Sequence, residues 1–151
     1  MKPFDIYNLS KELDLVITEK HEQKGWDGDD AAPITKKLKD YCLLEFKLMC
    51  NHIEFIIGED VEIKMPEITP NTDGSISIHF KTDECDTVIR FSISDDGNIM
   101  EYFGETKSKK ASISFTAKNF ADNTLHHWLI TKHAQPKIKN LNKNQQLSGA
   151  T

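Results

Sequence analysis

Six histidines and three cysteines are the residues of this chain that could hold a metal ion. Structural zinc sites usually show close ligand pairs of the form C-x2-C or H-x3-H, whose members are three or four positions apart. Cys50 and His52 are two apart within a predicted helix, and His126 and His127 are adjacent within another. Such neighbours on a helix point in different directions. The sequence therefore predicts no metal site and no cofactor, and it predicts that Cys42 and Cys50 are small core residues.

Nucleophilic catalysis has one candidate pair, Cys85 with His79 across a predicted hairpin. A reactive cysteine needs a nearby base or positive charge that lowers the pKa of its thiol. Cys85 falls in a polar turn that could expose it, but no residue near it in the sequence is basic enough to favour the thiolate form. Neither a nucleophile elbow nor a phosphate-binding glycine loop occurs. The sequence therefore predicts no catalytic residue, and a small hydrolase or nuclease built on turn carboxylates stays open as an alternative.

An acidic loop over residues 25–33 carries the other unusual chemistry, with three aspartates, two glycines and a proline around Trp26. A calcium-binding EF-hand loop would need oxygen ligands over twelve positions and a terminal Glu, which this loop lacks. Turn formation explains the aspartates, and the Trp ring needs somewhere to be buried. We expect either a structural clamp or a recognition surface. The candidate binding residues of this loop are Trp26, Asp27, Asp29 and Asp30.

The charge is divided unevenly along the chain. The net charge is −5, but residues 1–105 hold 11 Lys or Arg and 23 Asp or Glu, whereas residues 106–151 hold 8 Lys and a single Asp. The first part therefore carries −12 and the second +7. Such a basic end could bind nucleic acid, could lie against the acidic body or could be a solvated terminus. Arg90 is the only arginine, which weakens the case for base or phosphate recognition.

Elements that would position these residues follow from hydrophobic periodicity. The pattern predicts helices over 10–24, 34–53 and 117–133, an edge strand over 61–65, strands over 76–80, 89–93 and 99–103, and a further candidate strand over 112–116. Ser10 would cap the first helix, Leu48 would lie on the buried face of the second, and Phe120 and Ala121 would lie on the apolar face of the third. Pro66 and Pro70 would break the chain after the edge strand. Short links between strands favour an antiparallel sheet. We expect an α+β fold with two N-terminal helices, an antiparallel three- to four-stranded meander, a C-terminal helix and a flexible basic tail. Residues 1–135 would form one domain and residues 136–151 the tail.

Two spaced motifs resemble a family of small, largely uncharacterised bacterial proteins. The first is a Trp-Asp-Gly loop, Gly25-Trp26-Asp27-Gly28, followed by the helix start Pro33-Ile34-Thr35. The second is a Pro-x-Ile-x-Pro-x-x-Asp-Gly-x-Ile run that leads into a strand, here residues 66–76. The resemblance covers about residues 25–103, and this chain has His79-Phe80 where the family tends to have Glu-Trp. It implies the helix, loop, helix and meander arrangement and implies no activity or cofactor.

These patterns favour a non-enzymatic interaction protein of a bacterium or its virus. It would bind a protein partner, such as a toxin or nuclease, in the manner of an antitoxin, immunity protein or defence inhibitor, because acidic surfaces complement nucleic-acid-binding proteins. The alternative is a nucleic-acid-binding protein that uses the C-terminal helix and tail, with Lys132, Lys137 and Lys139 as the contact residues. The few cysteines, the missing signal-peptide core and the absence of a membrane-length apolar run favour a cytoplasmic protein without a membrane partner.

Overall fold

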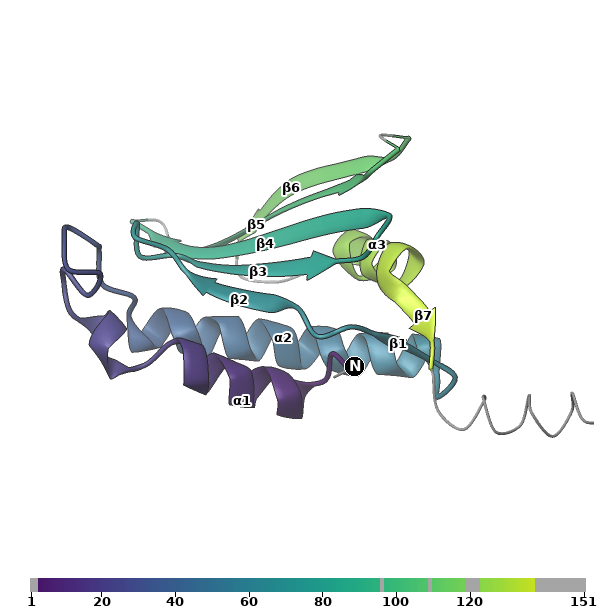
Figure 1. Cartoon of the computed structure of the whole chain (residues 1–151), viewed down its shortest axis with the longest axis horizontal. Coiled ribbons are helices and arrows are strands. Elements are labelled where there is room, and N and C mark those ends of the chain that lie inside the picture. Colours follow the sequence, from purple (N-terminus) through teal and green to yellow (C-terminus); the bar gives the residue numbers. More distant parts are fainter. Residues whose placement is uncertain (1–2, 96, 109, 119–122, 138–151) are drawn as a thin grey trace, which may run out of the picture.

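The computed structural model describes residues 3–95, 97–108, 110–118 and 123–137, and it confirms an α+β fold (Figure 1). The helices are α1 (Ile6–Val16), a short 3-10 helix η1 (Glu19–Glu22), α2 (Lys36–Ile57) and α3 (Asn123–His133). The strands are β1 (Val61–Ile63), β2 (Glu67–Pro70), β3 (Ile76–Lys81), β4 (Cys85–Ser94), β5 (Gly97–Thr106), β6 (Ser112–Lys118) and β7 (Ala134–Pro136).

A five-stranded antiparallel meander, in the order β2-β3-β4-β5-β6, forms the larger sheet. Alternate residues of its central strands face the helices and are buried, as their period of two predicts: Ile76, Ile78, Phe80, Ile89, Phe91, Met100 and Tyr102. The sequence predicts three or four strands, and the additional one is β2. Pro66, just before this strand, and Pro70, its last residue, suggested a break, but β2 lies at the sheet edge, where proline is tolerated.

Helices α1 and α2 lie beside each other across one face of this sheet (Figure 1). The predicted helix over 10–24 is misplaced, because α1 begins at Ile6 and ends at Val16. Asp5, not Ser10, is its N-cap, and the Asp5 carboxylate accepts the backbone N–H of Asn8 at 2.7 Å. Helix α2 agrees more closely with its prediction. Its cap is Thr35, and it extends to Ile57 before Gly58 adopts a φ of 70°.

The predicted helix over 117–133 is too long at its start. Residues 117 and 118 belong to β6, which pairs with β5 up to the register Ile99↔Lys118, and α3 begins at Asn123. Pairing with β5 therefore overrides the helical spacing of the sequence in this region. Phe120 and Ala121, which the sequence places on the apolar face of this helix, lie outside the described residues. Leu125, Trp128 and Leu129 are buried, as the same spacing predicts.

A second sheet of two strands joins β1 to β7 in antiparallel register, with Val61 opposite Pro136. The backbone N–H of Lys137 donates to Asp60 O at 3.0 Å, so the chain is paired past the boundary predicted at residue 136. Residues 138–151, which make up most of the predicted tail and include Lys139, lie outside the described residues. Among the described helices, none is long and apolar enough to cross a membrane.

Candidate functional site

Trp26 is held inside its own loop. Its indole Nε1–H donates to Ala32 O at 2.8 Å, and its ring lies 4.6 Å from the buried imidazole of His21, centroid to centroid. The side chain is half-buried and packs against the core. Because the indole N–H already donates to Ala32 O, it is not available as a donor to a partner. The geometry thus favours the structural clamp of the two roles that the sequence left open for Trp26.

The aspartates of the same loop divide into two kinds. Asp27 Oδ1 accepts the backbone N–H groups of Asp29 at 2.9 Å and Ala31 at 3.2 Å, which is the arrangement of an Asx turn. The Asp27 carboxylate therefore shapes the loop. Asp29 and Asp30 are exposed at its tip. Of the four candidate residues in this loop, these two are the ones whose carboxylates can meet a partner.

The two motifs that carry the family resemblance contact each other. The backbone N–H of Ala32 donates to Thr72 O at 2.7 Å, which ties the Trp26 loop to the turn before β3. Gly74 sits in this contact with a φ of +89°, and a Cβ added there would lie 2.9 Å from Pro33 O. Only glycine combines that backbone conformation with that approach. The spacing of the two motifs along the chain does not predict that they meet.

Arg90 is fully engaged within the protein. Its guanidinium donates to Asp73 Oδ2 at 2.5 Å, to Glu101 Oε1 at 2.6 Å and to Ser75 Oγ at 3.1 Å. The hydrogen bond from Ser75, together with that from Arg90, lowers the pKa of Asp73 to about 2. Arg90, the one arginine of the chain, therefore links the turn before β3, through Asp73 and Ser75, to Glu101 on β5.

The predicted lysines lie at the other end of the molecule. Lys132 Nζ lies 5.5 Å from the centroid of the Trp128 ring on α3, a cation–π contact within the protein. Lys137 follows β7. In Figure 1 the loop after η1 lies where α2 begins, and α3 and β7 lie where α2 ends. The structure therefore does not bring the loop residues and the lysines into one site, and Lys139 lies outside the described residues.

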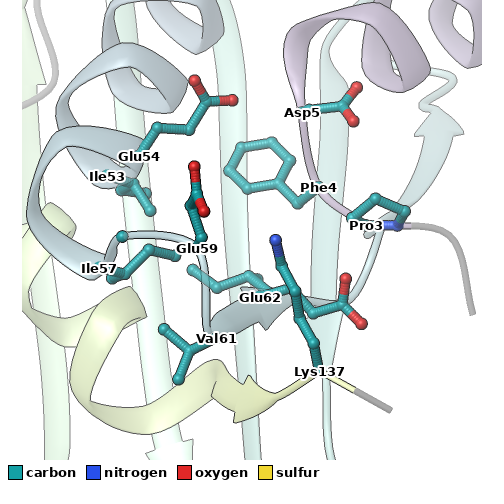
Figure 2. Close-up of a pocket in the computed structure, with 12 residues that line it drawn as sticks. Pro3, Phe4, Asp5, Ile53, Glu54, Ile57, Glu59, Val61, Glu62 and Lys137 are labelled. Carbon is teal, nitrogen blue, oxygen red and sulfur yellow. The ribbon is translucent and has the colours of Figure 1, made fainter. Parts of the chain in front are cut away.

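Lys137 lines a cavity of about 340 Å³ between the N-terminal segment, the end of α2 and β1 (Figure 2). Four carboxylates line it with this lysine, which gives the lining a formal charge of −3: Asp5, Glu54, Glu59 and Glu62. Figure 2 shows the Lys137 side chain reaching into the cavity among these acids. A phosphate backbone would meet these carboxylates beside Lys137, which counts against nucleic-acid binding by this lysine.

The solvent-facing side of α2 carries an apolar stripe that the sequence analysis missed. Leu44, Leu48 and Phe55 have exposed fractions of 55%, 52% and 88%. Spacings of four and eleven residues place them on one side of the helix, opposite the buried Phe46 and Met49. Leu48 was expected on the buried face, which is wrong. A helical projection groups these three residues on one side of α2, but it does not show which side of the helix faces the sheet. We call them the α2 stripe.

The cysteines have the properties of core residues. All three are buried, and burial raises the pKa of Cys42, raises that of Cys50 to about 12 and raises that of Cys85. Cys85 does not lie in an exposed turn as expected. Its Sγ lies 3.8 Å from Thr87 Oγ1, whereas His79 pairs with Asp86 at 3.2 Å. Because a thiol of raised pKa stays protonated near neutrality, these residues are poor nucleophiles.

Within the part of the chain that the structure describes, no group of three or more His, Cys, Asp or Glu side chains could hold a metal ion. No protein-family model, curated protein or solved structure matches this chain.

Proposed function

We propose that this chain is a non-enzymatic interaction protein that binds another protein through the α2 stripe. The observation that carries the proposal is the exposure of Leu44, Leu48 and Phe55 on one side of a long helix. Clustered large apolar side chains on a surface mark interaction sites, whereas single ones are ordinary. A helix that presents such residues at this spacing fits an apolar groove of a partner.

The charge of the chain supports a basic partner. Residues 1–105 carry a net charge of −12, and the cavity beside Lys137 adds a concentrated group of carboxylates at one end of α2. Acidic surfaces steer the encounter with basic proteins, while buried apolar anchors supply the affinity. A toxin or a defence nuclease that binds nucleic acid through a basic surface would have the required charge. The resemblance to small bacterial proteins supports placing this chain in a bacterium or its virus, as an antitoxin, immunity protein or inhibitor.

Capture of partners from cells of the source organism, at low and at high salt, tests this proposal. The captured protein is identified, expressed separately and titrated against the wild-type chain by calorimetry. The double variant Leu48→Ala/Phe55→Ala should weaken binding by at least about tenfold, since apolar anchors dominate interface energies. Its thermal stability should stay near that of the wild type, because both side chains are exposed.

Tyr7→Ala/Leu15→Ala is the matched control. Both residues are large, apolar and exposed to a similar degree, at 70% and 67%, but they belong to α1. This control should bind the partner as the wild type does. Equal weakening in the two double variants would contradict a specific role of the α2 stripe. A chain that captures no partner at either salt concentration would contradict the proposed function itself.

A further inference from the structure

His52 and His126 face each other across two helices. His52 belongs to the second half of α2, His126 to the first turn of α3, and their Nδ1 atoms lie 2.5 Å apart. The ring centroids are 4.8 Å apart, with the planes inclined at 65°. In the sequence, the close pairs are Cys50 with His52 and His126 with His127, and neither pair shares one face of a helix. The actual pair is separated by 74 positions, so it can be seen only in the fold.

A cavity of about 410 Å³ lies beside this pair. Its lining contains three imidazoles, two further polar side chains and two isoleucines: His52, His126, His127, Asn123, Thr131, Ile56 and Ile130. The space can hold several water molecules, each of which needs roughly 30 Å³. The histidine pair therefore adjoins a hollow large enough for water ligands.

We infer that His52 and His126 bind one divalent transition-metal ion of the Zn²⁺, Cu²⁺ or Ni²⁺ kind through their Nδ1 atoms, with water completing the coordination. Imidazole nitrogen is a preferred donor for these ions and a poor one for Mg²⁺ and Ca²⁺. Two helices hold the donors, so both rings start close to the positions that a bound ion requires. The proposal is independent of partner binding by the α2 stripe.

The geometry needs only a small adjustment. A tetrahedral ion at about 2.0–2.1 Å from each nitrogen sets the two donors about 3.3 Å apart, so the Nδ1 atoms, now 2.5 Å apart, must separate by about 0.8 Å. Rotation of the half-buried His52 ring toward the cavity would separate the two Nδ1 atoms by this amount. In the paired state the two Nδ1 atoms share one proton. In the bound state each neutral ring carries its proton on Nε2, and no net proton is released.

The ion would join α2 to α3, and only the folded chain brings the two donors together. Binding to the native state alone raises stability by mass action, so the melting temperature should rise with the concentration of free ion. Two protein ligands bind more weakly than the four of a structural zinc site. We therefore expect saturable binding of one ion per chain, reversed by a chelator.

Titration of the full chain with ZnCl₂ and NiCl₂ by calorimetry, with MgCl₂ as the contrasting ion, tests the inference. Thermal melts at each concentration supply the second readout. His52→Gln should weaken Zn²⁺ binding by at least about tenfold and remove the rise in melting temperature. Because His52 is only half-buried, this variant keeps the fold, which its melt without metal verifies. Cu²⁺ added to the wild type should give an electron paramagnetic resonance spectrum with coupling to imidazole nitrogens.

His127→Gln is the matched control, because His127 lines the same cavity and is the sequence neighbour of His126. This variant should bind Zn²⁺ within about twofold of the wild type. Zn²⁺ affinity that is unchanged in His52→Gln would overturn the inference, because the ion would then bind elsewhere. A wild-type chain that shows neither heat of binding nor a shift of the melt up to millimolar Zn²⁺ would also overturn it. The two histidines would then form a hydrogen bond only.

Discussion

The indole N–H of Trp128 donates to Thr87 Oγ1 at 2.8 Å, which joins α3 to the middle of the large sheet. Thr87 is fully buried, and its Oγ1 also lies 2.7 Å from His133 Nε2. Since the indole is a donor only, the threonine hydroxyl accepts from Trp128 and can donate to a neutral His133. Gly104 on β5 leaves room for the indole, because a Cβ there would lie 2.5 Å from Trp128 Nε1.

Thr87→Val should lower the free energy of unfolding by about 2–3 kcal/mol. The substitution keeps the shape of the side chain but leaves two buried polar atoms, Trp128 Nε1 and His133 Nε2, without their partner. Urea denaturation followed by tryptophan fluorescence measures the change. Thr69→Val, at an exposed position of β2, is the control and should stay within about 0.5 kcal/mol of the wild type. Equal effects of the two substitutions would contradict a special role of Thr87.

Stability should fall between about pH 6.5 and pH 4 because of His133. Burial, aided by His79 and opposed by Asp86, lowers the pKa of His133 to about 4 in the folded chain. In the unfolded chain the group titrates near its ordinary value of about 6.5. Within this window the unfolded state binds a proton that the folded state does not, so lowering the pH favours unfolding, by up to about 3 kcal/mol in total. Above pH 6.5 the contribution is constant.

Urea denaturation across pH 4–8 measures this dependence. His133→Gln keeps a hydrogen-bonding side chain without a titrating group, and it should flatten the curve between pH 6.5 and 4 even though its stability is lower at pH 7. His79→Gln serves as the comparison and should keep most of the slope. A slope that persists unchanged in His133→Gln would show that another group is responsible.

Gly74→Ala should destabilise the protein more than Gly28→Ala. Both glycines have nearly the same positive φ, 89° and 87°, so both substitutions share a backbone cost of about 1–2 kcal/mol. The added methyl at position 74 would also lie 2.9 Å from Pro33 O, whereas nothing lies within 4 Å at position 28. Overpacking adds about 1–3 kcal/mol. Thermal and urea unfolding of the two variants measure the difference, and equal losses would contradict close docking of the two loops.

Trp26→Phe should lower the free energy of unfolding by about 1 kcal/mol, because Phe keeps an aromatic ring near His21 but lacks the N–H that Ala32 O accepts. Urea denaturation measures this loss. A partner captured through the α2 stripe should bind the variant with unchanged affinity in calorimetry. A loss of affinity without a loss of stability would instead assign Trp26 to recognition.

Strands β3, β4 and β5 could be predicted from the sequence because apolar residues alternate along each of them, and because Asp-Gly turns precede β3 and join β4 to β5. The boundaries of α1 and α3 could not. Asp5 competes with Ser10 as a cap, and pairing with β5 extends β6 into a segment with helical spacing. Such errors arise because tertiary pairing overrides local preference.

Prediction of the candidate site was weaker for a related reason. The sequence identified Trp26 and Asp27 as unusual residues, but their hydrogen bonds within the loop favour a structural role. The α2 stripe and the His52–His126 pair depend on which side of a helix faces the sheet and on which helices adjoin. Neither property follows from the spacing of residues within one segment.

Strand β1 is hydrogen-bonded to segments near both ends of the described chain. The backbone N–H of Phe4 donates to Ile63 O at 2.6 Å, and all three residues of β1 pair with β7. The meander is built from hairpins between neighbours, whereas the partners of β1 are far away in sequence, with Phe4 59 positions from Ile63 and Pro136 75 positions from Val61. Local hairpins close quickly, and distant pairings must first overcome a larger loss of chain entropy. The β1–β7 pair should therefore form late in folding. Destabilising changes there should mainly speed unfolding and leave the refolding rate of the meander nearly unchanged.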